Sequence, residues 1–184
     1  PWGGMPRPNM ILGRTSCDAG YKGYQAMARY YQVPTLIYDL KSRAVPDLAY
    51  DDPEVEKRYV EHEKGQLQTL VAFLQKHTGR KVRWDDVSEA IVKHHQARDL
   101  WHDIYELRKA VPCPVPVGDT ASCMFPLYYM MGTQEGLDYY RKFHDEVAHR
   151  VAHKIGVIPN EKYRLLWGGI PQWHNLGFFN TLES

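Results

Sequence analysis

A cysteine near the start of this 184-residue chain has the sequence surroundings of a reactive or metal-binding thiol. Cys17 follows a short apolar run at residues 10–14, and helix-like and strand-like segments follow it at residues 24–31 and 35–38. This order predicts a strand, a turn, a helix and a strand, with Cys17 at the carboxyl end of the first strand, where open α/β sheets bind ligands. The positive end of the helix favours the thiolate, which binds iron or attacks an electrophile.

The neighbours of Cys17 help to decide between a site and a core position. A lone cysteine is more often a small buried hydrophobe than a ligand. Here the flanking residues Thr15, Ser16 and Asp18 are polar, which suits a site better than a core. We therefore treat these four residues together as the first candidate site.

A second candidate lies near the other end of the chain, in a glycine turn. Gly168 and Gly169 follow an apolar segment and lead to Trp173 and His174 at the expected start of a helix. Glycines let a backbone approach a ligand closely, and a helix start favours anionic groups. An equally open interpretation is that the glycines only form a turn and that Trp173 fills a core.

The nine histidines raise the question of a metal site. Glu146, His149 and His153 are spaced to lie on neighbouring positions of a helix. A carboxylate-bridged di-iron bundle needs two Glu-x-x-His elements, and the chain has this one. We therefore expect a solvated helix face here.

Composition and charge exclude several classes of function. Hydrophobic residues make up 43% and charged residues 24% of the chain, which is typical of a globular protein, and the net charge of +1 favours neither nucleic acid nor a membrane surface as a partner. No apolar run approaches the roughly 18 residues of a spanning helix. Three cysteines do not form a disulfide framework, so we expect a cytoplasmic protein. The start at Pro1, without a methionine, suggests a piece of a longer protein.

The remaining elements follow from caps, prolines and helical spacing. We expect a long helix from Asp51 or Asp52 to Gly79, a second from Asp85 or Asp86 to Pro112, and an extended stretch at 111–117. These are followed by a short helix at 122–131 that is interrupted or starts near Pro126, a third long helix from Thr133 to Gly156, a strand at 163–167 and a helix at 171–184. Residues 41–50 are expected to form a connection. The predicted class is α/β with a large helical portion. Residues 1–50 would end one α/β lobe, 51–158 would form a helical region, and 159–184 would be the first strand-helix unit of a second lobe.

A family resemblance rests on the order in which several features appear. They are Ser16-Cys17-Asp18 with Lys22, the Pro34 strand toward Asp39, a helix ending Thr78-Gly79-Arg80-Lys81, a helix with Arg98 and Leu100, the stretch from Pro112 to Pro116, the Gly132-Thr133 helix with Glu146 and Arg150, and the segment from Tyr163 to Trp173. Over nearly the whole chain this order resembles the 2-hydroxyacyl-CoA dehydratase and benzoyl-CoA reductase family.

The resemblance implies a fold and a cofactor. It implies two flavodoxin-like lobes with a helical region, and a four-iron four-sulfur cluster held by three cysteines. Among the residues of this chain, only Cys17 corresponds to a cluster cysteine, whereas Cys113 and Cys123 match no ligand and are expected to be structural. The other ligands would lie outside residues 1–184, so this chain alone is expected to lack iron and activity. Thr15, Ser16 and Asp18 would tune the cluster, while Trp173 and His174 would line the cleft from the opposite lobe.

The resemblance also implies partners and a reaction. A related second subunit would pair with this one, and an ATP-dependent iron–sulfur activator would supply low-potential electrons to a CoA thioester carbonyl. The resulting ketyl radical anion expels a hydroxyl in the dehydratases, whereas the reductases direct the electron into an aromatic ring. Aromatic residues tilt the expectation slightly toward ring reduction: Tyr128, Tyr129, Tyr139, Tyr140, Trp167 and Trp173.

Two alternatives of other classes remain open at this stage. The chain could be a non-catalytic helical interaction module in which Cys17 is buried. It could also be a cysteine hydrolase in which Cys17 meets a histidine in space.

Overall fold

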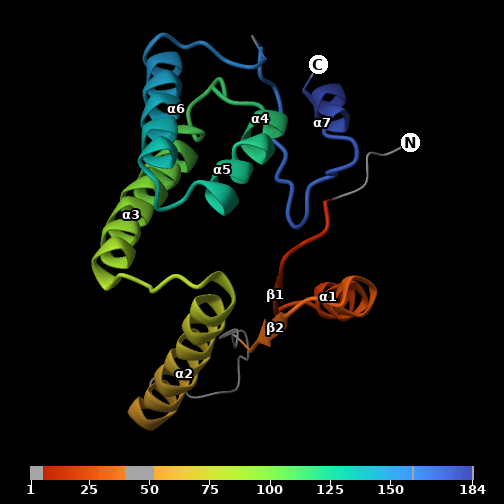
Figure 1. Ribbon diagram of the computed structural model, residues 1–184. Helices are drawn as coiled ribbons and strands as arrows, with labels where there is room; N and C mark the ends of the chain where they lie inside the picture. The colour runs from red at the N-terminus through yellow and green to blue at the C-terminus, as the bar shows by residue number, and fades with distance from the viewer. Residues whose placement is uncertain (1–5, 40–51, 159, 184) are drawn as a thin grey trace. The chain divides into compact units, whose positions relative to one another are not determined.

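The chain folds into two compact units. The computed structural model describes residues 6–39, 52–158 and 160–183 (Figure 1). One unit comprises Pro1–Val82 and the other Arg83–Ser184, and each is described by itself. The boundary falls inside the stretch 51–158 that the sequence assigns to one helical region, and the three-part division stays a prediction. The connection expected at residues 41–50 lies outside the described residues.

The N-terminal unit contains the expected strand-helix-strand arrangement. Strand β1 (Ile11–Arg14) pairs in parallel with β2 (Thr35–Tyr38), and α1 (Asp18–Tyr31) connects them and packs on both. The two strands and the end of α1 are where the sequence predicts them. The helix begins at Asp18, earlier than the predicted residue 24. The start was missed because Gly20 and Gly23, which disfavour a helix, lie in its first turns.

A close approach of side chain to backbone positions α1 on the strands. A Cβ atom added at Gly13 of β1 would overlap the ring of Tyr24 in α1, so the ring lies directly against the strand where a side chain is missing. Since α1 starts at Asp18, this contact also sets where the first turn of the helix begins relative to the strands.

Helix α2 (Pro53–Thr78) completes the described part of the N-terminal unit and packs near β2 (Figure 1). The Asp52 side chain accepts a hydrogen bond from the Glu54 amide (2.9 Å), and Pro53 occupies the first turn. At the other end Gly79 has a φ of 69°, a left-handed conformation that favours glycine. Both predicted ends of this helix are confirmed.

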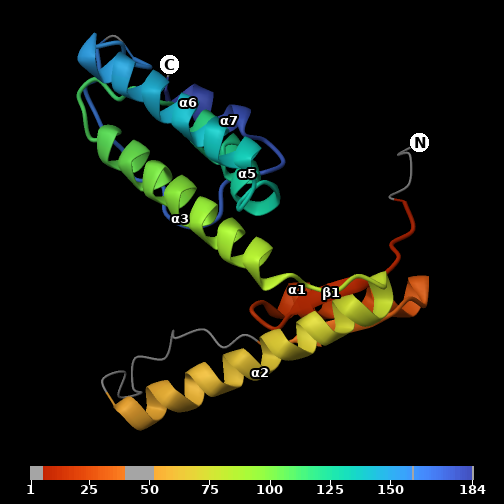
Figure 2. The same ribbon diagram turned by 60° about the vertical axis from the view of Figure 1, so that its left-hand side comes forward.

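A pair of long helices forms the core of the C-terminal unit. Helices α3 (Trp84–Leu107) and α6 (Gln134–Ala152) lie side by side in both views (Figures 1 and 2). The fully buried residues between and beside them are Ala97, Ile104, Val115, Leu137, Tyr140 and Val147. The Thr133 hydroxyl accepts a hydrogen bond from the Gly136 amide (3.0 Å), which confirms the predicted cap of α6.

Several predicted ends in this unit are wrong. Helix α3 starts at Trp84, with Asp85 and Asp86 in its first turn where acidic residues favour the helix dipole, and it ends at Leu107, well before Pro112. Helix α6 ends at Ala152 and does not reach Gly156. The helix expected at 122–131 is two short helices, α4 (Val117–Ser122) and α5 (Met124–Tyr129), which meet at Cys123, so the extended stretch ends one residue early.

The C-terminal segment differs most from expectation. Residues 161–168 have no regular secondary structure, so the strand predicted at 163–167 is wrong, and the last helix is only α7 (Gly177–Leu182). The guanidinium of Arg164 donates hydrogen bonds to the carbonyl oxygens of Lys109 (3.0 Å) and Ala110 (2.8 Å), just after the end of α3. These bonds hold the segment against a helix end, while the described C-terminal unit offers no strand for it to pair with.

The described residues are mostly helical with one small parallel sheet, which confirms an α/β fold with a large helical part. None of the described helices is both long enough and apolar enough to cross a membrane.

A hydrogen-bonded sulfur and two tyrosines join α6 to the junction of α4 and α5. The Tyr139 hydroxyl donates to Cys123 Sγ (2.9 Å), and the Tyr140 hydroxyl donates to the Cys123 carbonyl oxygen (2.7 Å). Burial raises the pKa of the Cys123 thiol, and burial likewise raises the pKa of both tyrosines well above the ordinary value.

This cluster predicts a loss of stability in alkaline solution. Unfolded chains ionise thiols and phenols from about pH 8.5 and pH 10, whereas the folded unit keeps these three groups protonated to higher pH. The unfolded state then binds fewer protons, so the free energy of unfolding falls as pH rises through this range. Urea unfolding at pH 8 and pH 10.5 measures the fall. The double variant Cys123→Ala and Tyr139→Phe should show a smaller fall, and an equal fall in both proteins would contradict the assignment.

Candidate functional site

Cys17 lies between the carboxyl end of β1 and the start of α1, as the sequence predicts. The residue is exposed, has extended backbone angles (φ −150°, ψ 128°) and immediately precedes α1. Its carbonyl oxygen accepts the first helical hydrogen bond, from the Tyr21 amide (2.8 Å), while its side chain caps no backbone amide. The thiol is therefore available to a ligand, beside the positive end of a 14-residue helix.

A polar network surrounds the aspartate that follows β2. Asp39 Oδ1 accepts a hydrogen bond from the Thr15 hydroxyl (2.5 Å), which ties the end of β2 to the turn before Cys17. Two side chains of α2 hold the same aspartate: Gln66 Oε1 accepts from the Asp39 amide (3.0 Å), and His62 Nε2 lies 2.9 Å from its carbonyl oxygen. The Cys17 turn is thus braced through Thr15 against β2 and α2.

Sequence reasoning found only part of this network. It selected Thr15 with Ser16 and Asp18, of which Ser16 is exposed in the turn and Asp18 is the first residue of α1. It missed Asp39 as a partner, although a polar residue directly after a predicted strand was a usable signal. Nothing in the sequence indicated that His62 and Gln66 would reach the end of β2, because that contact depends on how α2 packs.

We expect Thr15→Val to loosen the Cys17 turn. Removing the hydroxyl leaves Oδ1 of the half-exposed Asp39 carboxylate without its hydrogen-bond donor, while His62 Nε2 stays 3.6 Å from Oδ2. A hydrogen bond to a charged group contributes about 1.5–3 kcal/mol, less at an exposed site. The free energy of unfolding should fall by about 1 kcal/mol, and hydrogen exchange at residues 15–17 should become faster. The matched control is Thr69→Val, whose hydroxyl bonds only to the Gly65 carbonyl oxygen within α2. Equal exchange in both variants would contradict the bracing role.

The residues of the second candidate have different surroundings. The Trp173 ring packs edge-on against Phe125 of α5, with 5.7 Å between ring centroids, and is 43% exposed. His174 is exposed and lines a pocket next to α7. Trp173 and His174 belong to the C-terminal unit and Cys17 to the N-terminal unit, so their meeting across a cleft stays a prediction.

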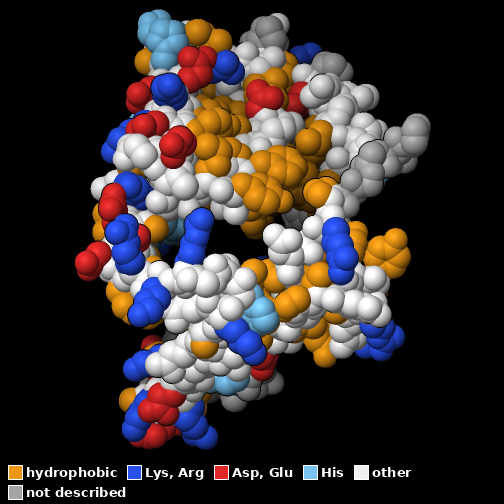
Figure 3. All heavy atoms as spheres, in the orientation of Figure 1, with side chains coloured by type: hydrophobic (Ala, Val, Ile, Leu, Met, Phe, Trp, Pro, Cys, Tyr) orange, Lys and Arg blue, Asp and Glu red, His pale blue; other side chains and the backbone are white. Residues whose placement is uncertain are grey.

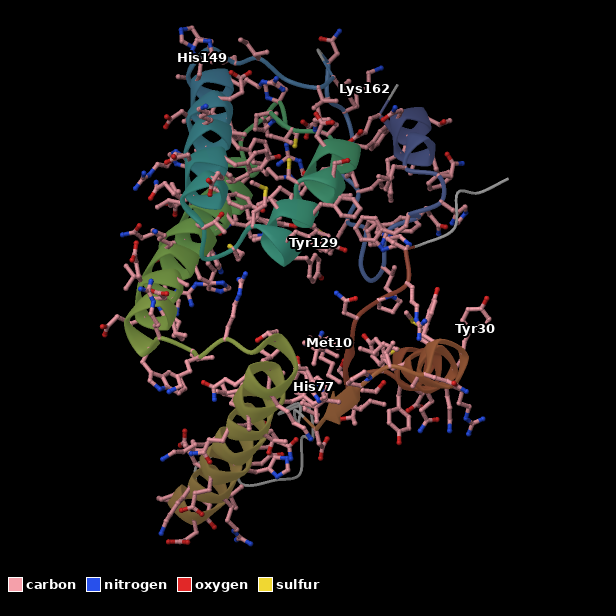
Figure 4. All side chains as sticks on the ribbon, in the orientation of Figure 1. Met10, Tyr30, His77, Tyr129, His149 and Lys162 are labelled. Carbon is pink, nitrogen blue, oxygen red and sulfur yellow. The ribbon has the colours of Figure 1, made fainter. Side chains whose placement is uncertain are left out.

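The histidines at the C-terminal end of α6, His149 and the capping residue His153, are engaged in contacts of their own. Glu146 pairs with Arg150 (2.7 Å), and the rings of His149 and His153 lie in contact, tilted by 35°, with centroids 4.1 Å apart. Figure 4 shows His149 projecting from the end of α6. No group of three or more His, Cys, Asp or Glu side chains in the described ranges is arranged to hold a metal ion.

Comparison with known proteins decides the family. The family model for 2-hydroxyglutaryl-CoA dehydratase, D-component, matches residues 3–184. The chain belongs to this family. A curated member, the alpha subunit of (R)-2-hydroxyglutaryl-CoA dehydratase from Acidaminococcus fermentans, is 23% identical over 183 residues, which cover 98% of this chain and 37% of the relative. The family resemblance is therefore confirmed, and this family member spans a little over a third of the length of that relative.

The donor set in this member of the family fits part of an iron–sulfur site. Cys17 offers an exposed thiol at a helix start, and it is the single cysteine among residues 1–82. A four-iron four-sulfur cluster needs about three or four thiolates. The N-terminal unit therefore has the donor for one ligand position and would need the others from elsewhere.

Proposed function

We propose that this chain is part of an iron–sulfur subunit of a 2-hydroxyacyl-CoA dehydratase and that Cys17 is one thiolate ligand of a four-iron four-sulfur cluster. The observation that carries the proposal is an exposed thiol between the carboxyl end of β1 and the start of α1, in a chain of the dehydratase family. When bound, such a cluster supplies low-potential electrons to a CoA thioester. The remaining ligands come from parts of the protein beyond this chain.

The residues around Cys17 have supporting roles in this proposal. Cys17 immediately precedes the N-terminal end of α1, and the bond between Thr15 and Asp39 fixes the turn that carries the thiol. Ser16 and Asp18 are next to the sulfur-bearing residue and would tune the cluster through hydrogen bonds. Trp173 and His174 would line the substrate side.

Dehydration is the better supported of the two reactions. The family model and the relative are both named for a 2-hydroxyglutaryl-CoA dehydratase. The aromatic residues that tilted the sequence argument toward ring reduction do not form one site: Tyr140 is fully buried in the helical core, whereas Tyr128 and Tyr129 are more than two-thirds exposed. They therefore do not favour benzoyl-CoA reduction.

The alternatives gain no support from the surroundings of Cys17. The hypothesis of a non-catalytic module expects Cys17 to be buried, whereas Cys17 is exposed. A hydrolase would need a base beside the thiol, and no histidine of the described residues is hydrogen-bonded to Cys17 Sγ.

The proposal includes a related second subunit, an ATP-dependent iron–sulfur activator and flavodoxin-like lobes in the whole protein.

The proposal is tested on the longer protein that contains this chain, purified without oxygen together with its second subunit. We expect it to convert a 2-hydroxyacyl-CoA to the enoyl-CoA, with loss of water, only when the activator and ATP are present. Mass spectrometry of the thioester measures the product. Release of free CoA without the activator would support a hydrolase, and no turnover by an iron-loaded complex would reject the proposal.

A further inference from the structure

A small pocket of the C-terminal unit has a lining suited to one kind of ligand. Its volume is about 270 Å³, and it is lined by Trp167, Gln172, His174, Asn175 and Phe178. Pockets that hold a drug-sized molecule measure roughly 300–1,000 Å³. This one is therefore large enough for a single ring system of a larger molecule.

The aromatic wall of the pocket is anchored. The Trp167 ring meets the ring of Phe179 edge-on at 5.1 Å between centroids, and Phe179 is only 2% exposed. The Trp167 indole nitrogen also donates to the Ile170 carbonyl oxygen (3.4 Å). Even so, Trp167 remains 42% exposed, so a held indole is available for stacking.

Two carboxamides provide the polar groups. Neither the Gln172 nor the Asn175 side chain forms a hydrogen bond with another described residue, although their backbones bond to each other (2.8 Å). Each carboxamide offers a donor and an acceptor in one plane. This pattern complements the edge of adenine, where an amino group lies beside a ring nitrogen.

The charge of the lining disfavours other parts of a nucleotide. Among the described residues that line the pocket there is no Lys, Arg, Asp or Glu. A phosphate would lack a partner there, whereas a neutral heterocycle that stacks and hydrogen-bonds would be satisfied. Figure 3 shows hydrophobic side chains gathered over the α5 part of the same unit, and Phe125 and Trp173 are among the exposed apolar residues there.

The geometry points to this pocket as the binding site for the adenine ring of a CoA thioester. This inference rests on the proposed function, because that function supplies a ligand with an adenine. Trp167 and Phe178 provide the stacking surface, and Gln172 and Asn175 read the edge of the base.

The test compares four probes on the 184-residue chain: CoA, adenosine, inosine, which has an oxygen in place of the amino group of adenine, and pantetheine, which lacks the base. Isothermal titration calorimetry measures each affinity for wild type, Trp167→Leu and Asn175→Leu. Trp84→Leu and Gln96→Leu are matched controls, since both residues are exposed on α3 and line no part of the pocket. Circular dichroism checks that each variant is folded, and Asn175 is an exposed position where the substitution leaves the core intact.

We expect Trp167→Leu to weaken CoA and adenosine binding by about tenfold or more, with pantetheine unaffected. Asn175→Leu should weaken both by about fivefold and reduce the preference for adenosine over inosine. Wild-type affinities in both variants, no adenosine binding by wild type, or an equal loss for pantetheine would each overturn the inference.

The outcomes also separate this inference from the proposed function. Unchanged CoA binding in the pocket variants overturns the adenine site and leaves the role of Cys17 standing. Adenosine binding that depends on Trp167, in a protein whose iron does not depend on Cys17, leaves the adenine site and rejects the cluster proposal.

Discussion

A Cys17→Ser variant of the longer protein, reconstituted without oxygen with iron and sulfide, is expected to lose most of its iron. A serine hydroxyl is a poor substitute for a thiolate, and removing one of about three protein ligands leaves too few to hold a cubane. The exposed position of Cys17 before α1 means that the substitution costs little folding stability, so loss of iron reports ligation. Iron analysis and the broad charge-transfer absorption measure the effect.

The matched control for this experiment is Cys113→Ser. The Cys113 thiol is half-buried and donates a weak hydrogen bond to the Val115 carbonyl oxygen (3.4 Å), an interaction that serine can replace. This variant should keep its iron. Full iron content in Cys17→Ser, or equal losses in the two variants, would reject Cys17 as the ligand.

Replacing Tyr140 by alanine is expected to unfold much of the C-terminal unit. The ring is fully buried and contacts the rings of Trp101 and Tyr139 edge-on, with centroids 5.7 and 5.2 Å apart. Truncation of a large buried aromatic residue costs about 3–5 kcal/mol, which approaches the whole stability of a small domain. Urea unfolding followed by circular dichroism measures the loss.

Two companion variants separate the contributions of Tyr140. Tyr140→Phe keeps the ring and removes only the bond to the Cys123 carbonyl oxygen, so it should cost about 0.5–1.5 kcal/mol. Tyr129→Ala, at a position 79% exposed, should change stability by less than about 0.5 kcal/mol. Similar losses in Tyr129→Ala and Tyr140→Ala would contradict the core assignment.

Local sequence signals correctly predicted the helices whose ends are marked by a capping residue. Asp52 and Thr133 each cap a helix by accepting a backbone amide, and Gly79 ends one in a left-handed conformation. Such signals act over one turn, so they can be read from neighbouring residues. The two strands β1 and β2 were predictable for the same reason, because each apolar run is short and bounded.

The errors arose where distant residues decide the conformation. The segment from Tyr163 to Trp167 is rich in residues that favour strands, yet its path depends on Arg164 bonding to carbonyl oxygens at 109 and 110. Periodicity carries no information about such a contact. A strand also needs a neighbour, and the described C-terminal unit supplies none.

The residues of the candidate site also differ in how far local sequence signals could find them. Cys17 was found because strand, turn and helix signals converge on it within a few residues. The partners of Thr15 were not found, since Asp39, His62 and Gln66 meet only after α2 packs near β2. The pocket around Trp167 was missed except for His174, because its lining depends on how the segment before α7 folds back.

The contact between Gly13 and Tyr24 links a residue that has no side chain to the position of the Cys17 thiol. A Cβ atom at position 13 would overlap the Tyr24 ring, so the ring, or α1 together with it, would have to shift away from the strands. The sulfur of Cys17 is attached at the start of that helix and would be displaced together with it. Substitutions at Gly13 are therefore limited by the position of the Cys17 sulfur as well as by packing against Tyr24.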